Sequence, residues 1–276
     1  MRRIRRSFAA MRREGRCGLI AYITCGDPSL DASVEIALEL ENAGADLLEL
    51  GVPFSDPIAD GPVIQAASQR AIERGTTLAS VIEVARRIRA SSEIPLILFS
   101  YLNPILRYGM ERFAHDAAAA GIDGVLLTDL PAESADSSRK VLKKAGLATI
   151  FLLAPTSTPP RIRMADRASQ GFVYYVSTTG VTGARRDLAP DLISRLDEIR
   201  RSLRNPIAVG FGISTGDQFA TLAPHCDAVV VGSAIVRAIA DGPPESAPDR
   251  AAAMVREILG GERTQRGIVS RAEGSI

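Results

Sequence analysis

The sequence lacks long apolar runs and holds few histidines and cysteines. No run approaches the roughly 18 apolar residues of a membrane-spanning helix, so we expect no membrane partner. The two histidines, His115 and His225, do not stand at metal-ligand spacing, so we expect no zinc site. The three cysteines, Cys17, Cys25 and Cys226, are an odd number without a CxxC motif. This pattern indicates reduced thiols and a cytoplasmic location.

The chain also lacks a strong net charge. Its 33 basic and 32 acidic residues leave a formal charge of +1, whereas a nucleic-acid-binding domain usually carries a strongly basic face. Residues 1–16 are the exception, with seven arginines and one glutamate. No apolar segment of a secretory signal follows them, which leaves two interpretations: a short transit peptide or an amphipathic leading helix. We favour the helix, because Ile4, Phe8 and Met11 recur at helical spacing.

What the sequence does contain is an alternation of short apolar runs and longer helical patterns. Strands that are apolar throughout are buried on both faces, as in a parallel sheet covered by helices. Eight such units in about 240 residues match a closed (β/α)8 TIM barrel. An open, doubly wound sheet is the alternative, disfavoured because no GxGxxG follows the first strand. The expected strands are 19–24, 47–51, 96–100, 124–128, 149–153, 172–176, 207–211 and 228–231.

The helical patterns complete a barrel with no linker inside it. We expect residues 1–276 to form a single domain, with a barrel core at about 18–240 and a C-terminal helix and tail at 241–276. The expected helices are 30–43, 62–74, 78–90, 111–120, 134–145, 160–169, 190–203, 215–223, 233–240 and 248–259.

Active sites of such barrels lie at the carboxyl ends of the strands. His115 falls in a helical pattern and His225 precedes the last strand, so we do not expect histidine chemistry. Glu49 stands late in the apolar second strand, where a carboxylate is rarely buried without a reason. Burial raises the pKa of a carboxyl group and allows it to act as an acid or base near neutrality. The alternative is a structural carboxylate paired with a buried lysine or arginine.

The loop after the second strand, GVPFSDPIADGP at 51–62, has three prolines and two aspartates. Proline stiffens a loop, so Asp56 and Asp60 would be held on a semi-rigid support. Ordinary turn chemistry is the alternative for both, because aspartate before proline or glycine is common in turns. For Asp27, in the run TCGDP at 24–28, we expect a cap of the next helix or turn.

Two glycine-containing runs follow the last two strands. They are Gly210–Ser214 and Gly232–Ser233, the second of which opens a helix. Barrels often bind phosphate at this position, where backbone amides and a helix N-terminus meet the anion. The loop at 178–187, TTGVTGARRD, is long enough to act as a lid. These patterns indicate a barrel that acts on a phosphorylated small molecule with carboxylates and without a metal.

Several short motifs together resemble the tryptophan synthase α-subunit family. The run LELGVPFSDPIADGPVIQ at 48–65 carries most of the resemblance, which covers about residues 8–240. It implies a lyase of tryptophan biosynthesis that cleaves indole-3-glycerol phosphate to indole and glyceraldehyde 3-phosphate. The other motifs are GDP (26–28), YLNP (101–104), TDLP (128–131), STTGVTGAR (177–185), GFGIS (210–214) and GSAIV (232–236).

The resemblance also implies roles for individual residues. Glu49 would be the catalytic acid–base, and Asp60 would face the indole nitrogen. Thr182 and Gly183 would belong to a lid, with Thr182 contacting Asp60. The residues implied to bind the substrate are Tyr22, Tyr101, Tyr174, Thr182, Gly183, Phe211, Gly212, Gly232 and Ser233.

The family works as an αββα complex with a β subunit that carries pyridoxal phosphate, whereas the α reaction uses no cofactor. The resemblance places the partner interface at Pro53, Asp56, Asn103 and Pro104. One departure is the pair at 178–179, two threonines where some members carry arginine, and the tail after Gly260 has no counterpart. Three alternatives stay open: a stand-alone lyase, a regulatory subunit with weak catalysis and a phosphosugar isomerase.

Overall fold

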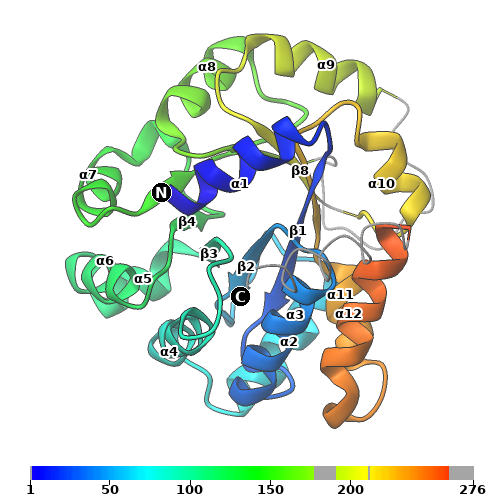
Figure 1. Cartoon of the computed structure of the whole chain (residues 1–276). Coiled ribbons are helices and arrows are strands. Elements are labelled where there is room, and N and C mark those ends of the chain that lie inside the picture. The colour runs from blue at the N-terminus through cyan, green and yellow to red at the C-terminus, as the bar shows by residue number, and fades with distance from the viewer. Residues whose placement is uncertain (1, 177–190, 211, 261–276) are drawn as a thin grey trace, which may run out of the picture.

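The strands of the protein form one parallel sheet that wraps into a barrel. The structure, a computed structural model, describes residues 2–176, 191–210 and 212–260. Figure 1 shows the strands at the centre and the helices around them. The strands within the described residues are β1 Gly18–Thr24, β2 Leu47–Gly51, β3 Leu96–Ser100, β4 Gly124–Leu127, β5 Ala148–Ile150, β6 Leu152–Leu153, β7 Val173–Val176, β8 Ile207–Gly210 and β9 Ala228–Val231.

The two ends of the sheet, β5 and β6, come from the same segment of the chain. The strand order is β5-β4-β3-β2-β1-β9-β8-β7-β6, and every neighbouring pair is parallel. The expected strand 149–153 is split at Phe151 into β5, which pairs with β4, and β6, which pairs with β7. The Phe151 carbonyl still accepts a hydrogen bond from the Tyr174 amide at 3.0 Å. The expectation of a single fifth strand is therefore wrong in detail, but the eight-position barrel is confirmed.

Helices follow the strands and cover the outer face of the sheet. Several begin at side-chain caps, such as Ser29, whose hydroxyl accepts from the Ala32 amide at 3.0 Å. No described helix is long and apolar enough to cross a membrane. The helices are α1 Arg2–Arg13, α2 Leu30–Asn42, α3 Pro62–Glu73, α4 Leu78–Arg89, α5 Leu102–Tyr108, α6 Met110–Ala119, α7 Asp136–Lys144, α8 Pro159–Ala168, α9 Leu192–Ser202, α10 Gly216–Leu222, α11 Ser233–Ala240 and α12 Ala247–Ile258, with 3-10 turns at Ala132–Ser134 and Pro244–Ser246.

The alternation of side chains along each strand divides the core into two layers. In β1, Leu19, Ala21 and Ile23 belong to the layer between the sheet and the helices. Ile20 and Tyr22 point the other way, into the barrel interior. The same parity in β2 sends Leu48 and Leu50 outward, so Leu47 and Glu49 face the interior. Strand register thus aims the Glu49 carboxyl group into the barrel.

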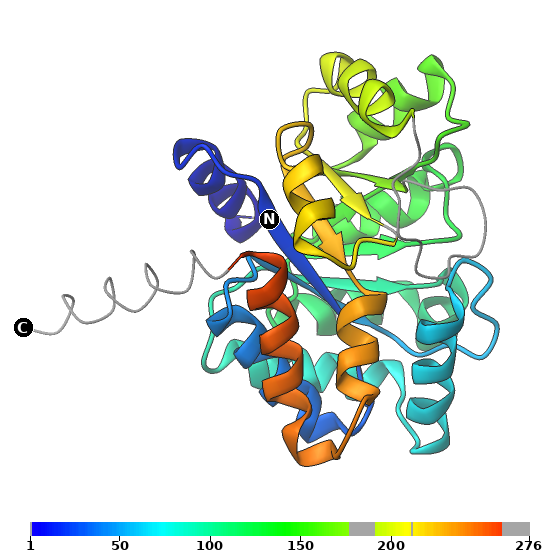
Figure 2. The same cartoon turned by 90° about the vertical axis from the view of Figure 1, so that its right-hand side faces the viewer.

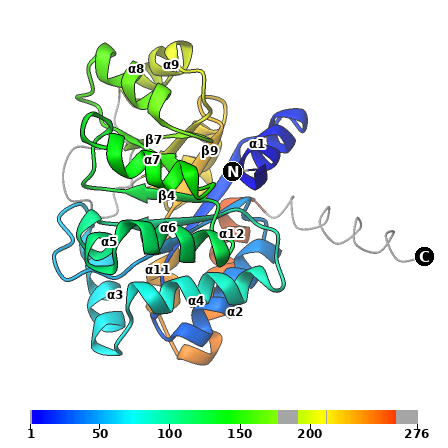
Figure 3. The same cartoon turned by 90° about the vertical axis from the view of Figure 1, so that its left-hand side faces the viewer.

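Helix α1 closes the end of the barrel opposite the strands' carboxyl ends. Its buried residues are Ile4, Phe8 and Met11, and the Phe8 ring lies 5.5 Å from the ring of Phe172. Figure 2 shows α1, in dark blue, standing outside the helical ring. Figure 3 shows it at one end of the barrel and α5 at the other. The expected amphipathic leading helix is confirmed, and the barrel opens at its carboxyl end.

Candidate active site

A pocket opens at the carboxyl ends of the strands. It brings together residues from five strands, the loop after β2 and the start of α11. Both carboxylates expected from the sequence line it, together with two of the three expected tyrosines. The lining residues are Tyr22, Glu49, Asp60, Gly61, Ile64, Phe99, Tyr174, Gly212, Val230, Gly232 and Ser233.

Glu49 reaches the pocket from β2 and is almost completely buried, with 1% exposure. Among the described residues, neither of its side-chain oxygens has a hydrogen-bond partner. Burial raises the pKa of Glu49 from 4.5 to about 8, because the charged form loses its hydration. A structural carboxylate would be paired with a base, and no described lysine or arginine pairs with Glu49. At neutral pH this group is mostly a protonated acid.

Asp60 approaches the same pocket from the loop between β2 and α3. The Tyr101 hydroxyl donates to Asp60 Oδ2 at 3.1 Å and accepts from the Ala59 amide at 2.9 Å. Burial raises the pKa of Asp60 to about 6, while the hydrogen bond from Tyr101 opposes the rise. The two carboxyl groups therefore differ near neutrality, since Asp60 is mostly ionised and Glu49 mostly protonated.

Two glycines provide room for the tyrosines that line the pocket. A Cβ atom at Gly51 would overlap the Tyr22 hydroxyl, and one at Gly210 would overlap the Tyr174 hydroxyl. The Tyr22 ring meets Phe99 edge to face, with ring centroids 5.2 Å apart. Tyr22, Phe99 and Tyr174 thus surround the pocket beside Glu49 with aromatic rings, which can pack against a planar apolar ring.

The part of the pocket at the start of α11 has the features of an anion site. Gly232 precedes the first turn of α11, and Ser233 is the first residue of that helix. The first amides of a helix lie outside its own hydrogen-bond ladder and point toward a ligand. Gly212 lies beside them with a φ of +86°, a conformation that favours glycine. The predicted phosphate residues Gly212, Gly232 and Ser233 are therefore brought together.

Some predicted residues lie outside the described part of the chain. These are Thr182 and Gly183, with the whole proposed lid at 178–187, and Phe211. Their expected contacts, including the one between Thr182 and Asp60, stay predictions.

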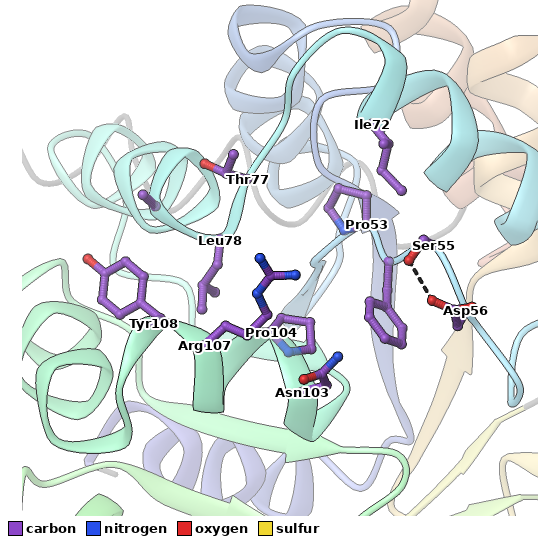
Figure 4. A pocket seen from close by; sticks show the side chains of 12 residues that line it. Pro53, Ser55, Asp56, Ile72, Thr77, Leu78, Asn103, Pro104, Arg107 and Tyr108 are labelled. Atoms are coloured by element: carbon purple, nitrogen blue, oxygen red, sulfur yellow. Dashed lines mark hydrogen bonds between the residues drawn. The ribbon is translucent and has the colours of Figure 1, made fainter.

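A second, more open groove lies at the barrel mouth. It contains all four residues that the sequence placed at a partner interface, namely Pro53, Asp56, Asn103 and Pro104. In Figure 4, Pro53 and Asp56 face Asn103 and Pro104 across the groove. The Ser55 hydroxyl donates to Asp56 Oδ2 at 2.6 Å.

The groove and the pocket are connected through one aromatic contact. The ring of Phe54, in the groove, lies 5.0 Å from the ring of Tyr101, which holds Asp60. The largest exposed apolar side chains of the described residues are Ile58 and Leu106, exposed by 78% and 57%. Both belong to segments that also supply the groove.

The expectations for Asp27 and the two histidines concern residues outside the pocket. Asp27 does not cap α2; it accepts two hydrogen bonds from Arg70, at 3.0 and 2.6 Å, while Ser29 is the cap. His115 is exposed on α6, and His225 pairs with Asp197 at 2.9 Å before β9, so neither reaches the pocket. The described residues contain no cluster of three or more His, Cys, Asp or Glu that could hold a metal ion.

Several pocket residues were not anticipated from the sequence. Phe99 and Val230 could have been found by counting alternate residues along their strands, because they share the parity of Ile97 and Ala228 in the interior layer. Ile64 lies on α3, and no sequence pattern distinguishes its side chain from other apolar positions of that helix.

Comparison with known proteins gives one consistent family. A sequence profile described as tryptophan synthase alpha chain matches residues 8–263. The tryptophan synthase alpha chain of Solibacter usitatus is 56% identical over 239 residues, which cover 87% of this chain and 90% of the relative. That of Acidiphilium cryptum is 45% identical, covering 95% of this chain and 99% of the relative.

Solved structures agree with the sequence relatives. Tryptophan synthase from Mycobacterium tuberculosis superposes with a TM-score of 0.85 at 37% identity, covering 95% of this chain and 98% of the other. A structure described as the tryptophan synthase a2b2 complex of Pyrococcus furiosus gives a TM-score of 0.83 at 38% identity, covering 88% and 98%.

Proposed function

The chain belongs to the tryptophan synthase alpha chain family, and we propose that Glu49 and Asp60 carry out the proton chemistry of its lyase reaction. That reaction is the cleavage of indole-3-glycerol phosphate to indole and glyceraldehyde 3-phosphate. The observation that carries the assignment is the Glu49 carboxyl group, buried without a described partner in a pocket that also holds Asp60. A buried polar group without a partner is costly to the fold, which points to a role toward a ligand.

The cleavage is a retro-aldol reaction, and the two carboxyl groups have the protonation states that it needs. Indole becomes a leaving group once C3 carries a proton, and the protonated Glu49 is the group that delivers it. Asp60, ionised, accepts a hydrogen bond from the indole N–H and stabilises the positive charge that develops there. The bond from C3 to the glycerol chain then breaks, and the ionised Glu49 takes the proton of the adjacent hydroxyl as the aldehyde forms. Protons balance, and Glu49 returns to its acid form.

Substrate binding is divided between two parts of the pocket. We assign the indole ring to the aromatic rings of Tyr22, Phe99 and Tyr174, and the phosphate to the start of α11 beside Gly212. The phosphate lies away from the reacting carbon, so its binding energy positions the substrate over Glu49. Tyr101 acts on the substrate through Asp60, whose carboxylate it orients. Thr182, Gly183 and Phe211 are proposed to complete the enclosure.

A β subunit is the proposed partner at the groove. The Pyrococcus relative assembles as an a2b2 complex, and we propose the same αββα heterotetramer for this chain. The groove supplies an apolar contact surface, with Ile58 exposed beside Pro53 and Asp56. A partner bound there would contact Phe54, which packs against Tyr101, and Tyr101 in turn holds the Asp60 carboxylate by a hydrogen bond. This contact explains how binding outside the pocket could change the rate inside it.

Three further parts of the proposal concern the chain as a whole. The chain needs no cofactor of its own, because the cleavage uses proton transfer alone, and pyridoxal phosphate belongs to the β subunit. We also propose that residues 1–276 form one barrel domain and that the protein works in the cytoplasm, a reducing compartment that suits its three free cysteines. The family membership favours a synthase subunit over a stand-alone lyase.

The direct test is to mix the purified chain with indole-3-glycerol phosphate and measure indole release with and without a β subunit. We expect slow release alone and faster release in the complex. Full activity of the isolated chain would favour the stand-alone lyase, and absence of indole in both assays would refute the proposed reaction.

A further inference from the structure

Two cysteines meet at the end of the barrel opposite the candidate active site. Cys17 precedes β1 and Cys226 precedes β9, 209 positions later, yet their sulfur atoms lie 3.7 Å apart. The two strands are neighbours in the sheet, with Gly18 in register with Ala228, and the Gly18 amide donates to the Asp227 carbonyl at 3.0 Å. The pairing of β1 with β9 is therefore what brings the two thiols together.

The geometry of this pair suits a covalent bond. A disulfide needs a sulfur–sulfur distance of about 2.05 Å and Cα atoms within about 7 Å. Backbones of adjacent strands lie about 4.7–4.9 Å apart, and the two cysteines stand one and two residues before the paired Gly18 and Ala228, which keeps their backbones close. The sulfur–sulfur distance requires an approach of less than about 2 Å, which side-chain rotation can supply. Weak hydrogen bonds to the carbonyls of Gly18 and Leu222, at 3.6 and 3.3 Å, are the contacts that rotation breaks.

A cavity reaches both cysteines. It lies between α1 and the loops before β1 and β9, and both cysteines line it. Cys17 and Cys226 are only 5% and 3% exposed, so this cavity is the route by which a small reagent would reach them. Arg12, Arg16 and Arg200 line it too. Arg16 pairs with Asp46 and Glu14, and Arg200 pairs with Asp227, whereas Arg12 makes no ion pair with any described residue. Arg12 therefore gives the cavity one cationic group that can attract a small anionic reagent.

The third cysteine lacks these features. Cys25 lies at the carboxyl end of β1 and lines none of the cavities described above. Burial raises the pKa of its thiol to about 12, and the pKa of Cys226 is raised too, by its hydrogen bond with Cys17 and by burial. What sets Cys25 apart is therefore its position, away from the cavity and from a second sulfur atom. Cys25 therefore serves as an internal reference for the other two.

We propose that Cys17 and Cys226 are a redox-sensitive pair, oxidised to a disulfide by low-molecular-weight disulfides such as oxidised glutathione. In the first step the Cys17 thiolate attacks one sulfur of the reagent, forms a mixed disulfide and releases one thiol. In the second step Cys226 attacks the Cys17 sulfur and releases the second thiol. Two protein thiols are oxidised and one reagent disulfide is reduced to two thiols, so electrons and protons balance.

The test counts thiols after oxidation of the folded, full-length chain. The reduced protein is incubated with oxidised glutathione, unfolded in the presence of N-ethylmaleimide and weighed by intact-protein mass spectrometry. We expect three maleimide groups on the untreated protein and one, on Cys25, after oxidation. A peptide digest without reductant should contain the segments around residues 17 and 226 joined. The thermal midpoint should rise on oxidation and return with dithiothreitol, because the cross-link restricts the unfolded chain.

Two variants serve as matched controls. Cys25→Ser should still form the cross-link and leave no thiol to alkylate. Cys226→Ala should show neither the joined peptide nor the rise in thermal midpoint. Uptake of three maleimide groups by the oxidised native protein would overturn the proposal. A covalent dimer, or a cross-link that includes Cys25, would overturn it equally.

Discussion

Replacing Glu49 with glutamine separates a catalytic carboxyl group from a structural one. Glutamine keeps the shape of the side chain and its hydrogen-bonding capacity, but it cannot transfer a proton. If Glu49 protonates indole C3, the loss falls on the transition state and lowers kcat and kcat/KM together. We expect a fall of at least about 10², the range of one general acid. The substrate should still bind, because we assign its ring and phosphate to other residues.

The same substitution should stabilise the protein, and increasingly so at higher pH. Between pH 4.5 and about 8 the folded chain keeps the Glu49 proton that the unfolded chain has lost, so stability falls as pH rises. From these two pKa values, the free energy of unfolding decreases through Glu49 by about 3 kcal/mol between pH 5.5 and pH 8. Glu49→Gln has no such group. The free energy of unfolding of Glu49→Gln, relative to that of the parent chain, should therefore increase by about 3 kcal/mol between pH 5.5 and pH 8.

Urea unfolding at several pH values and single-turnover cleavage, on the same preparations, measure both effects. Asp60→Asn is the matched control. The Asp60 carboxyl group has a pKa of about 6, against an ordinary 3.8, so most of its effect on the free energy of unfolding is complete by pH 6. The stability of Asp60→Asn relative to the parent chain should therefore increase by less than about 1 kcal/mol over the same pH range. A Glu49→Gln protein that unfolds more easily at every pH, yet cleaves normally, would refute the catalytic assignment and indicate a structural ion pair.

Three other outcomes are expected. The kcat/KM of the αβ complex should rise with pH as Asp60 ionises near 6 and fall as Glu49 loses its proton near 8; a flat profile would contradict the assigned roles. Gly232→Asp should raise KM at least about tenfold, because its carboxylate repels the phosphate. Gly232→Asn should raise KM less, because it carries no charge and a Cβ atom at this position meets Tyr22 at an ordinary 3.5 Å. Equal increases in KM would indicate a steric effect. Adding a β subunit should raise the cleavage rate at least tenfold, which corresponds to about 1.4 kcal/mol off the activation barrier. Asp56→Ala should weaken that activation and leave the melting temperature unchanged. Undiminished activation of this variant would show that Asp56 is not part of the interface.

The barrel could be predicted because its strands carry a strong local pattern. Residues 47–51, 96–100 and 228–231 are β-strands with the bounds expected from their apolar runs. Helix α5 was missed because its seven residues contain Pro104 and follow directly on a strand, so no helical period develops. The break at Phe151 was missed because it depends on how β4 and β7 pair on either side, which is a tertiary constraint.

The site was predictable where a residue broke its local pattern and unpredictable where it matched it. Glu49 is conspicuous as a carboxylate in an apolar strand, whereas Phe99 looks like any core residue. Asp27 was misread because a cap and an ion pair share the same local sequence. Its true partner, Arg70, stands 43 positions away and becomes a neighbour only in the folded chain.

The helix that closes the barrel also bears on how the chain assembles during synthesis. Residues 2–13 leave the ribosome before any strand, but Phe8 packs against Phe172, and Ile4 packs close to Gly171. Some 160 residues separate the helix from that contact surface. Until they are made, the apolar face of α1 stays exposed to chaperones and to other nascent chains, flanked by arginines that keep it hydrated. Docking of α1 is thus a late event of folding, carried out by a helix that is synthesised before the barrel strands.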